Sequence, residues 1–186
     1  MSELLTATRF GNPILREEMR RISPEGILSE EIQNLIENMY FTLSEKKYGV
    51  GIAAPQIGAR IALSVVGIKP TPTRPNLEPF NTVLINPVVT ETFGDAEEMW
   101  EGCISSGEGA NTLYAKVPRF KKIRLQWLDE GAKQHDEVLE GFVAHVAQHE
   151  TDHLNGILFV DRVADPKTYM LADEYKKLMD AENAST

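Results

Sequence analysis

The segment His149-Glu150-Thr151-Asp152-His153 limits what this chain can fold into more than any other feature of the sequence. Two histidines four residues apart lie one turn apart on the same face of an α-helix, so both imidazoles can reach one metal ion. Glu150 then lies beside that ion, where its carboxylate can act as a base. The segment predicts a helix with two metal ligands; the alternative is an amphipathic helix whose histidines lie at its solvated edge.

Cys103 is the only cysteine in the chain and the first candidate for a third ligand. Its neighbours Gly102 and Ser105 indicate a turn-like segment, whereas a free cysteine is more often a small buried hydrophobe. One thiolate and two imidazoles leave the fourth tetrahedral position open for water, which is typical of a catalytic site. Glu174 is the second candidate and would indicate a zinc endopeptidase, but its neighbours Lys176 and Lys177 favour a solvated role.

Composition sets limits on the class of protein. The 186 residues are enough for one domain, and a lone cysteine forms no intramolecular disulfide and fits a reducing compartment. The formal charge of −9 argues against direct nucleic-acid readout, which needs a basic surface. No stretch approaches the length of a membrane span, and residues 1–20 contain no continuous apolar run.

Hydrophobic spacing and turn signals predict an α+β fold, with small, mainly antiparallel sheets packed around a central helix that carries the His149–His153 motif. The order of elements shows no βαβ alternation. The expected helices are 29–44, capped by Ser29, 141–154 and one that opens at Asp165-Pro166. The expected strands are 60–68, 82–90, 122–128 and 133–139, the last two forming a hairpin around Asp129-Glu130-Gly131. The expected loops are 47–56, 69–81 and 106–116.

Three segments together resemble the signature motifs of peptide deformylases, in that family's order. They are residues 49–56 (GVGIAAPQ), 101–105 (EGCIS) and 148–156 (QHETDHLNG). Residues 11–16 (GNPILR) and 82–87 (TVLINP) extend the resemblance over nearly the whole chain. The resemblance implies one catalytic domain, residues 1–186, that removes the N-formyl group from the formylmethionine of newly made polypeptides.

The resemblance also implies a role for each matching site residue. Cys103, His149 and His153 would hold the metal, and Glu150 would be the general base. The side-chain amide of Gln56 and the backbone N–H of Ile104 would stabilise the oxyanion that forms when water attacks the formyl carbon. The backbone of Gly51 would bind the substrate peptide as an added strand.

Cofactor and partners follow from the same resemblance. The ligand set suits Fe²⁺, Zn²⁺, Ni²⁺ or Co²⁺, and the family favours Fe²⁺ in the cell. Nascent N-formylmethionyl peptides are the expected partners, the expected location is a bacterial-type cytoplasm, and contact with the ribosome is left open. A divergent relative with another substrate or a binding role is the alternative, although the presence of Gln56 and Glu150 argues against a loss of catalysis.

Residues 106–116 depart from the family's pattern. This segment is longer, more polar and richer in glycine, and it lacks the arginine and the proline that the family usually carries there. Because the region borders the substrate groove in the family, the departure bears on peptide specificity. Outside the motifs, His135 is expected to face solvent, and His145 is not expected to be a fourth ligand because that would close the site. Glu101 either orients a histidine or pairs with Arg119, or it forms an ordinary surface ion pair.

Overall fold

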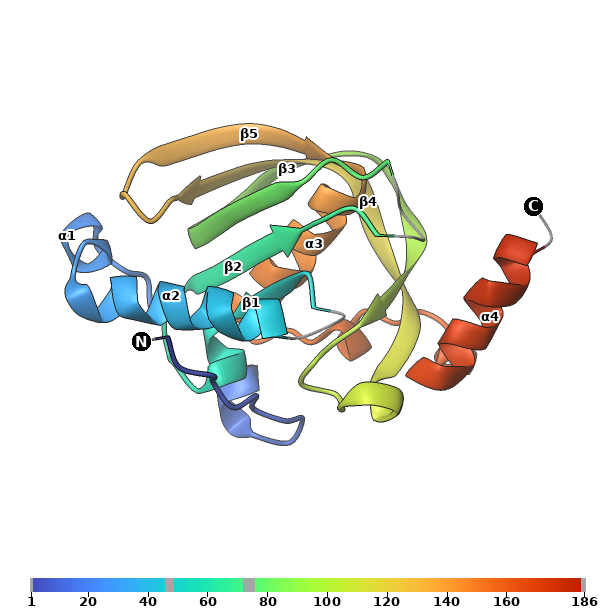
Figure 1. Ribbon diagram of the computed structural model, residues 1–186. Helices are drawn as coiled ribbons and strands as arrows, with labels where there is room; N and C mark the ends of the chain where they lie inside the picture. Colours follow the sequence, from blue (N-terminus) through green and yellow to red (C-terminus); the bar gives the residue numbers. More distant parts are fainter. Residues whose placement is uncertain (1, 46–48, 72–75, 185–186) are drawn as a thin grey trace.

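The computed structural model describes residues 2–45, 49–71 and 76–184. Its strands form one antiparallel sheet in the order β1-β2-β3-β4-β5, with β6 paired to the start of β4. Helix α2 packs on one face of this sheet, and α3 packs on the other (Figure 1). The predicted combination of helices with mainly antiparallel strands is therefore confirmed.

The elements have the following bounds. The strands are β1 (Gly51–Ala53), β2 (Leu63–Ile68), β3 (Phe80–Gly102), β4 (Leu113–Leu128), β5 (Gln134–Glu140) and β6 (Met170–Leu171). The helices are α1 (Pro24–Ile27), α2 (Glu30–Glu45), α3 (Gly141–Leu154) and α4 (Ala172–Ala184). Short 3₁₀ turns cover Pro13–Arg16, Ala54–Ile57, Gly109–Asn111, Phe159–Asp161 and Pro166–Thr168.

The centre of the sheet is apolar on both faces, because alternate residues of a strand point to opposite sides. Leu63 and Val65 of β2 pack with Met39 of α2. Val66 is the next residue of β2; its side chain points to the opposite face of the sheet and packs with Val146 of α3. Burial of one such side chain stabilises the fold by about 1.5–3 kcal/mol. These two apolar layers hold α3, and with it the motif, against the sheet.

The predicted strand 82–90 is much too short, because β3 runs from Phe80 to Gly102. Shifts in its pairing with β4 occur at Ile85/Val88, Val89/Glu91 and Phe93/Ala96. Such bulges bend a strand without ending it. As a result the described strands join into one bent sheet instead of several small ones, and β3 ends directly before Cys103.

Several predicted elements agree with the structure. Helix 29–44 is α2, and its first turn is capped by Ser29, whose Oγ accepts from the N–H of Ile32 at 3.4 Å. Helix 141–154 is α3. The predicted hairpin is formed by β4 and β5, and Oδ1 of Asp129 accepts from the N–H groups of Gly131 and Lys133, at 2.9 Å each.

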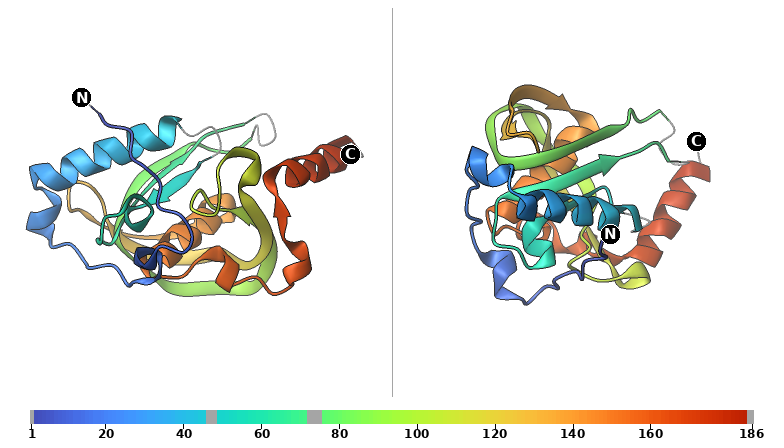
Figure 2. Two further views of the ribbon diagram at one scale, coloured as in Figure 1. Left: turned by 90° about the horizontal axis from the view of Figure 1, so that it is seen from below. Right: turned by 60° about the vertical axis from the view of Figure 1, so that its left-hand side comes forward.

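Three other boundaries are wrong. Residues 113–116, expected in a loop, start β4, because they pair with β3 and β6. The segment expected as a loop over 47–56 contains β1 and the turn Ala54–Ile57, and its first two residues lie outside the described part of the chain. The last helix begins at Ala172 and not at Asp165-Pro166, because Met170 and Leu171 pair with β4. Figures 1 and 2 show this helix, α4, at the edge of the molecule.

Candidate metal centre

Three candidate ligands meet where the end of β3 lies against α3. Cys103 Sγ is 3.3 Å from His153 Nε2, which is 3.2 Å from His149 Nε2. All three ligand atoms lie within 4.8 Å of one another. Ligand atoms at about 2.0–2.3 Å from one metal, at tetrahedral angles, lie roughly 3.3–3.7 Å apart, so the two distances from His153 Nε2 fit ligands of a single ion.

The surroundings of these atoms also fit a metal. Cys103 is 3% exposed and His153 is 1% exposed. Burial lowers the pKa of His153 well below its ordinary value and keeps the imidazole neutral, as metal ligation requires. A thiolate and two imidazoles form a donor set for a divalent transition metal.

Glu150 lies beside the ligands and is buried. Burial raises its pKa to about 7, and its Oε2 has no hydrogen-bond partner among the described residues. A Cβ atom at Gly51 would lie 2.2 Å from Oε1 of Glu150, so only glycine leaves room there for this carboxylate. The glycine of the first motif thus contacts the glutamate of the third.

Gln56 approaches the site from the turn Ala54–Ile57. Its Oε1 accepts from the N–H of Ala53 at 2.8 Å, which fixes the direction of the amide. Its Nε2 then points to Cys103 Sγ and to Ser105 Oγ, at 3.3 Å each. Gln56 is 1% exposed, so this amide is a fixed donor at the edge of the ligand cluster.

Glu101 joins several charged groups behind the ligands. Its Oε2 accepts from His149 Nδ1 at 2.8 Å, and its two oxygens accept from Arg119 Nε and Nη2 at 2.5 and 3.1 Å. Burial alone would raise the pKa of Glu101, but the hydrogen bonds from His145, His149 and Arg119 outweigh it and hold that pKa well below the ordinary value. The alternative of a surface ion pair is wrong, because Glu101 is 4% exposed.

Known proteins are similar to this chain in sequence and in fold. The sequence profile of the polypeptide deformylase family matches residues 5–169. This chain belongs to the peptide deformylase family. A peptide deformylase of Leptospira biflexa is 38% identical over 165 residues, which cover 87% of this chain and 88% of that protein. Peptide deformylase 1 of Nitrosomonas europaea is 39% identical over 167 residues, 89% of this chain and 90% of that protein.

Solved structures agree with the sequence relatives. The Met-Ala-Ser-bound class I type b peptide deformylase of Acinetobacter baumannii superposes with a TM-score of 0.80 at 32% identity, over 88% of this chain and 100% of that chain. A peptide deformylase of Synechococcus elongatus in complex with actinonin gives a TM-score of 0.74 at 34% identity, over 88% of this chain and 81% of that one.

Sequence reasoning missed the second ion pair of this deformylase-family site. Asp152 accepts from Arg119 Nη1 at 2.6 Å and from Arg162 Nε at 2.5 Å. Asp152 is 7% exposed and follows His149 by three residues on α3. The available signal was a carboxylate on the inward face of a helix, but nothing in the spacing pointed to its two arginines.

Arg9 was missed as well. Its Nη1 donates to the carbonyls of Ile104 and Gly107, at 2.6 and 2.7 Å, and its Nη2 pairs with Glu108 at 3.0 Å. The N–H of Phe10 donates to the carbonyl of Ser105 at 2.9 Å. The N-terminal segment therefore holds the loop that follows Cys103, and the atypical segment of this chain has a partner far away in the sequence.

The remaining candidates lie elsewhere. Glu174 is on α4, paired with Lys177 at 2.6 Å, and does not belong to the cluster of ligand atoms. The prediction that His135 faces solvent is wrong in part, because its side chain is 21% exposed, stacks on Trp127 and bonds Asp129 at 2.8 Å. Its neighbours in the hairpin cover it.

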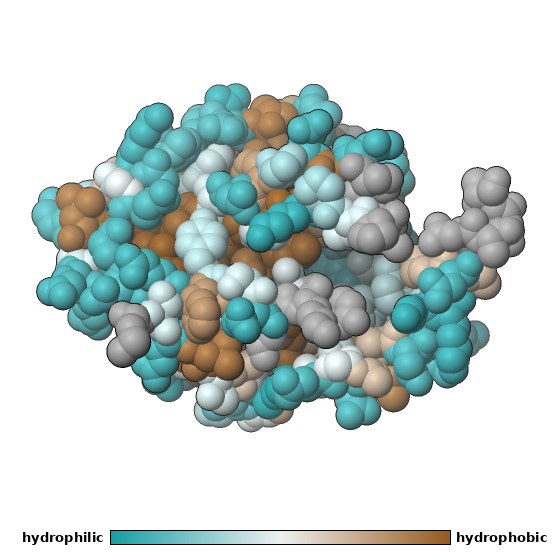
Figure 3. All heavy atoms as spheres, in the orientation of Figure 1, coloured by the Kyte–Doolittle hydropathy of each residue, from teal (hydrophilic) through white to brown (hydrophobic). Residues whose placement is uncertain are grey.

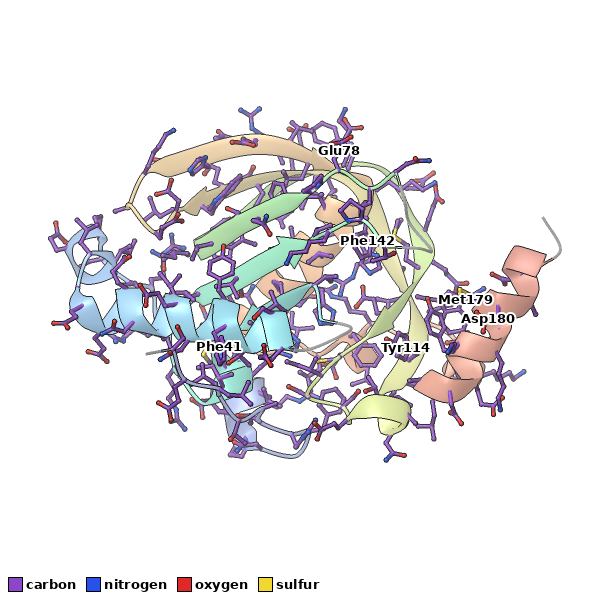
Figure 4. The ribbon with its side chains drawn as sticks, viewed as in Figure 1. Phe41, Glu78, Tyr114, Phe142, Met179 and Asp180 are labelled. Atoms are coloured by element: carbon purple, nitrogen blue, oxygen red, sulfur yellow. The ribbon has the colours of Figure 1, made fainter. Side chains whose placement is uncertain are left out.

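The surface is hollowed between the main body and α4 (Figure 3). In the same orientation, Phe142 lies above this hollow and Tyr114 below it (Figure 4). Tyr114 packs against Gly102, where an added Cβ would lie 2.5 Å from its ring, and it stacks on Tyr175 of α4 at 4.3 Å.

No helix in the described part of the chain is long and apolar enough to span a membrane.

Proposed function

We propose that this chain hydrolyses the N-formyl group of formylmethionyl peptides and releases formate. The observation that carries the proposal is the meeting of Cys103, His149 and His153 beside the buried carboxylate of Glu150, whose Oε2 has no hydrogen-bond partner among the described residues. Membership of the peptide deformylase family supports it. We further propose that residues 1–186 form one catalytic domain with α3, the helix of the motif, at its centre.

Cys103, His149 and His153 would hold the metal. A bound divalent metal polarises a carbonyl and makes a water molecule a better nucleophile near neutral pH. We propose Fe²⁺ as the metal loaded in the cell, with Zn²⁺, Ni²⁺ and Co²⁺ as alternatives that the same ligands suit. A thiolate beside ferrous iron is sensitive to oxygen, so the Fe²⁺-loaded protein must be prepared and assayed under anaerobic conditions.

Glu150 would move the proton. Its Oε2 accepts a proton from the water whose oxygen attacks the formyl carbon. The carbon–nitrogen bond then breaks, and the same carboxyl group gives the proton to the leaving nitrogen. The products are formate and the free amino group of methionine. A pKa of about 7 suits a group that must first accept and then donate a proton at neutral pH.

Gln56 and Ile104 would stabilise the charge that develops on the formyl oxygen. The Nε2 of Gln56 is already directed at the cluster by the bond between its Oε1 and Ala53. The N–H of Ile104 follows Cys103 directly, and no described residue accepts a hydrogen bond from it. Preorganised donors of this kind stabilise the transition state by about 3–4 kcal/mol each when the site excludes water.

Gly51 would bind the substrate backbone. β1 is the end strand of the sheet and pairs only with β2 among the described strands. A peptide that adds to this free edge as a strand lies directly over Glu150, since Gly51 adjoins that carboxylate. We place the reaction in the cytoplasm, with nascent chains as the substrate and contact with the ribosome left open.

The test is formate release from a formyl-Met-Ala-Ser peptide under anaerobic conditions. Metal-free protein is loaded separately with Fe²⁺, Zn²⁺, Ni²⁺ or Co²⁺, and acetyl-Met-Ala-Ser serves as the substrate control. We expect release from the formyl peptide only. Protein that binds metal stoichiometrically and yet releases no formate with any of the four metals would refute the proposal.

A further inference from the structure

His145 is a buried histidine that the proposed reaction leaves without a role. It lies one helical turn before His149 on the same face of α3 and is 7% exposed. Its ring packs edge-on against Phe142, with centroids 5.9 Å apart. The cluster of ligand atoms does not include it.

Within the described part of the chain, the ring of His145 hydrogen-bonds to Glu101. His145 Nε2 is 2.8 Å from Oε1 of Glu101, and that oxygen also accepts from Arg119 Nε at 2.5 Å. Because Glu101 is a carboxylate and can only accept, the hydrogen of this bond belongs to His145 Nε2. The same reasoning puts a hydrogen on Nδ1 of His149, which bonds Oε2 of Glu101 at 2.8 Å.

That assignment bears on the metal site. Because Nδ1 is engaged by Glu101, Nε2 is the nitrogen that His149 directs at His153, and it is the atom left to bind a metal once its own hydrogen is lost. The last side-chain torsion of a glutamate is soft, so the direction of Oε2 depends on what holds Oε1. Oε1 accepts one hydrogen bond from Arg119 and a second from His145, which lies on the same helix as His149.

We propose that His145 is a positioning residue for the metal centre: it fixes the Glu101 carboxylate, which in turn fixes the tautomer and the ring orientation of His149. This inference rests on the proposed role of His149 as a metal ligand. Partners behind a ligand histidine commonly contribute about 10–100-fold to metal affinity, and we assign part of that contribution to His145.

The test measures Co²⁺ affinity of metal-free protein by competition with a chelator. His145→Leu removes the donor but keeps an apolar side chain of similar length, and we expect it to weaken Co²⁺ binding about tenfold or more. His145→Gln carries its own Nε2 donor and should recover the affinity to within about threefold, since it restores the same hydrogen bond.

Gln148→Leu is the matched control. Gln148 is also buried on α3, and its amide bonds the backbone of Phe120 at 2.8 and 3.2 Å without touching Glu101. Its loss should destabilise the helix by a similar amount and leave Co²⁺ affinity unchanged. Equal affinities of His145→Leu and Gln148→Leu, or a His145→Gln variant as weak as His145→Leu, would overturn the proposal.

Wild-type protein gives a second test that needs no variant. Long-range ¹H–¹⁵N NMR spectra of the metal-free protein should show hydrogen on Nε2 of His145 and on Nδ1 of His149. A hydrogen found only on Nδ1 of His145 would overturn the positioning role. Wild-type protein that binds Co²⁺ without the thiolate absorption of Cys103 would instead overturn the proposed metal centre itself, so the two failures are distinguishable.

Discussion

At the scale of single residues, Glu150 combines two properties that rarely occur together. It is 3% exposed, and it lies between two candidate ligands on α3. We predict that Glu150→Gln retains one metal per chain and loses at least about 100-fold in kcat, because the shape of the side chain is kept while the proton acceptor is lost. Formate release and metal content of the same preparation check this; turnover within tenfold of wild type would contradict the role.

The burial of Glu150 has a cost that the metal-free protein should reveal. Its pKa is about 7 when folded and about 4.5 when exposed, so the folded state holds the proton more tightly. Stability must then decrease as pH rises from about 4.5 to 7 and level off above, by about 3 kcal/mol in all. We expect metal-free Glu150→Gln to exceed wild type in unfolding free energy by that amount at pH 8.

The measurement is urea unfolding of both metal-free proteins at pH 8 and at pH 4. Groups away from Glu150 titrate equally in the two proteins, so the difference isolates Glu150 together with its coupling to His149 and Glu101. At pH 4 the carboxyl is mostly protonated in both states, and the two unfolding free energies should nearly coincide. A constant difference at the two pH values would show that the Glu150 pKa is not raised.

The identity of the third metal ligand, Cys103 or Glu174, distinguishes a deformylase from an endopeptidase. We predict that Cys103→Ala loses bound metal, because one of three ligands is removed from a cluster that otherwise fits one ion. Glu174→Gln should keep metal, since Glu174 is exposed on α4 and paired with Lys177. Metal content after gel filtration checks both variants. Retention by Cys103→Ala together with loss by Glu174→Gln would indicate an endopeptidase-type ligand set.

At the scale of elements, the N-terminal segment and the loop after Cys103 act together. Arg9 bonds two carbonyls of this loop, and one of them belongs to Ile104, the proposed oxyanion donor. We predict that Arg9→Met lowers kcat/KM about tenfold through kcat, because small misplacements of a catalytic group cost about that much or more. Metal content should not change, since no ligand is touched.

Arg16→Met is the control for this prediction. Arg16 lies in the same N-terminal segment, is similarly exposed, and pairs with Asp161 away from the loop. Its loss should leave kcat/KM within about twofold, as expected for an exposed ion pair. Equal effects of the two substitutions would show that Arg9 contributes only general stability and does not position Ile104.

At the scale of the whole molecule, α4 is an attachment to a core that is complete without it. None of the side chains of residues 172–182 is fully buried. Tyr175 of α4 stacks on Tyr114, and its ring centroid lies 5.4 Å from that of Trp100. Aromatic pairs contribute about 0.5–1.5 kcal/mol each. The two pairs together amount to about 1–3 kcal/mol, so truncation after Leu171 should lower Tm by about 2–12 °C, at roughly 2–4 °C per kcal/mol for a chain of this size.

Calorimetry of the truncated chain, with metal content measured alongside, checks this. Metal content should stay at the wild-type level, because Cys103 directly follows β3 and both histidines lie on α3. Tyr175→Leu in the full chain should reproduce most of the decrease. A loss of more than about 15 °C, or of the metal, would show that α4 belongs to the core.

Local signals in the sequence determined a good part of this protein. Helical spacing and a serine cap predicted α2, the motif predicted α3, and an aspartate–glycine turn predicted the β4–β5 hairpin. The candidate ligands His149 and His153 follow from a spacing of four residues. In each case the residues that interact lie within one or two turns of each other, so their spacing already contains the geometry.

Tertiary structure decided the rest, because the partners lie far apart in the chain. Arg9 and Ile104 are 95 residues apart, and His145 and Glu101 are 44 residues apart. The sequence is compatible with a surface ion pair or a buried one at Glu101, and only the packing around the side chain decides which of the two forms. Pairing along the sheet likewise extended β3 to Gly102 and delayed α4 to Ala172, against the local preference of both segments, because a strand partner outweighs propensity.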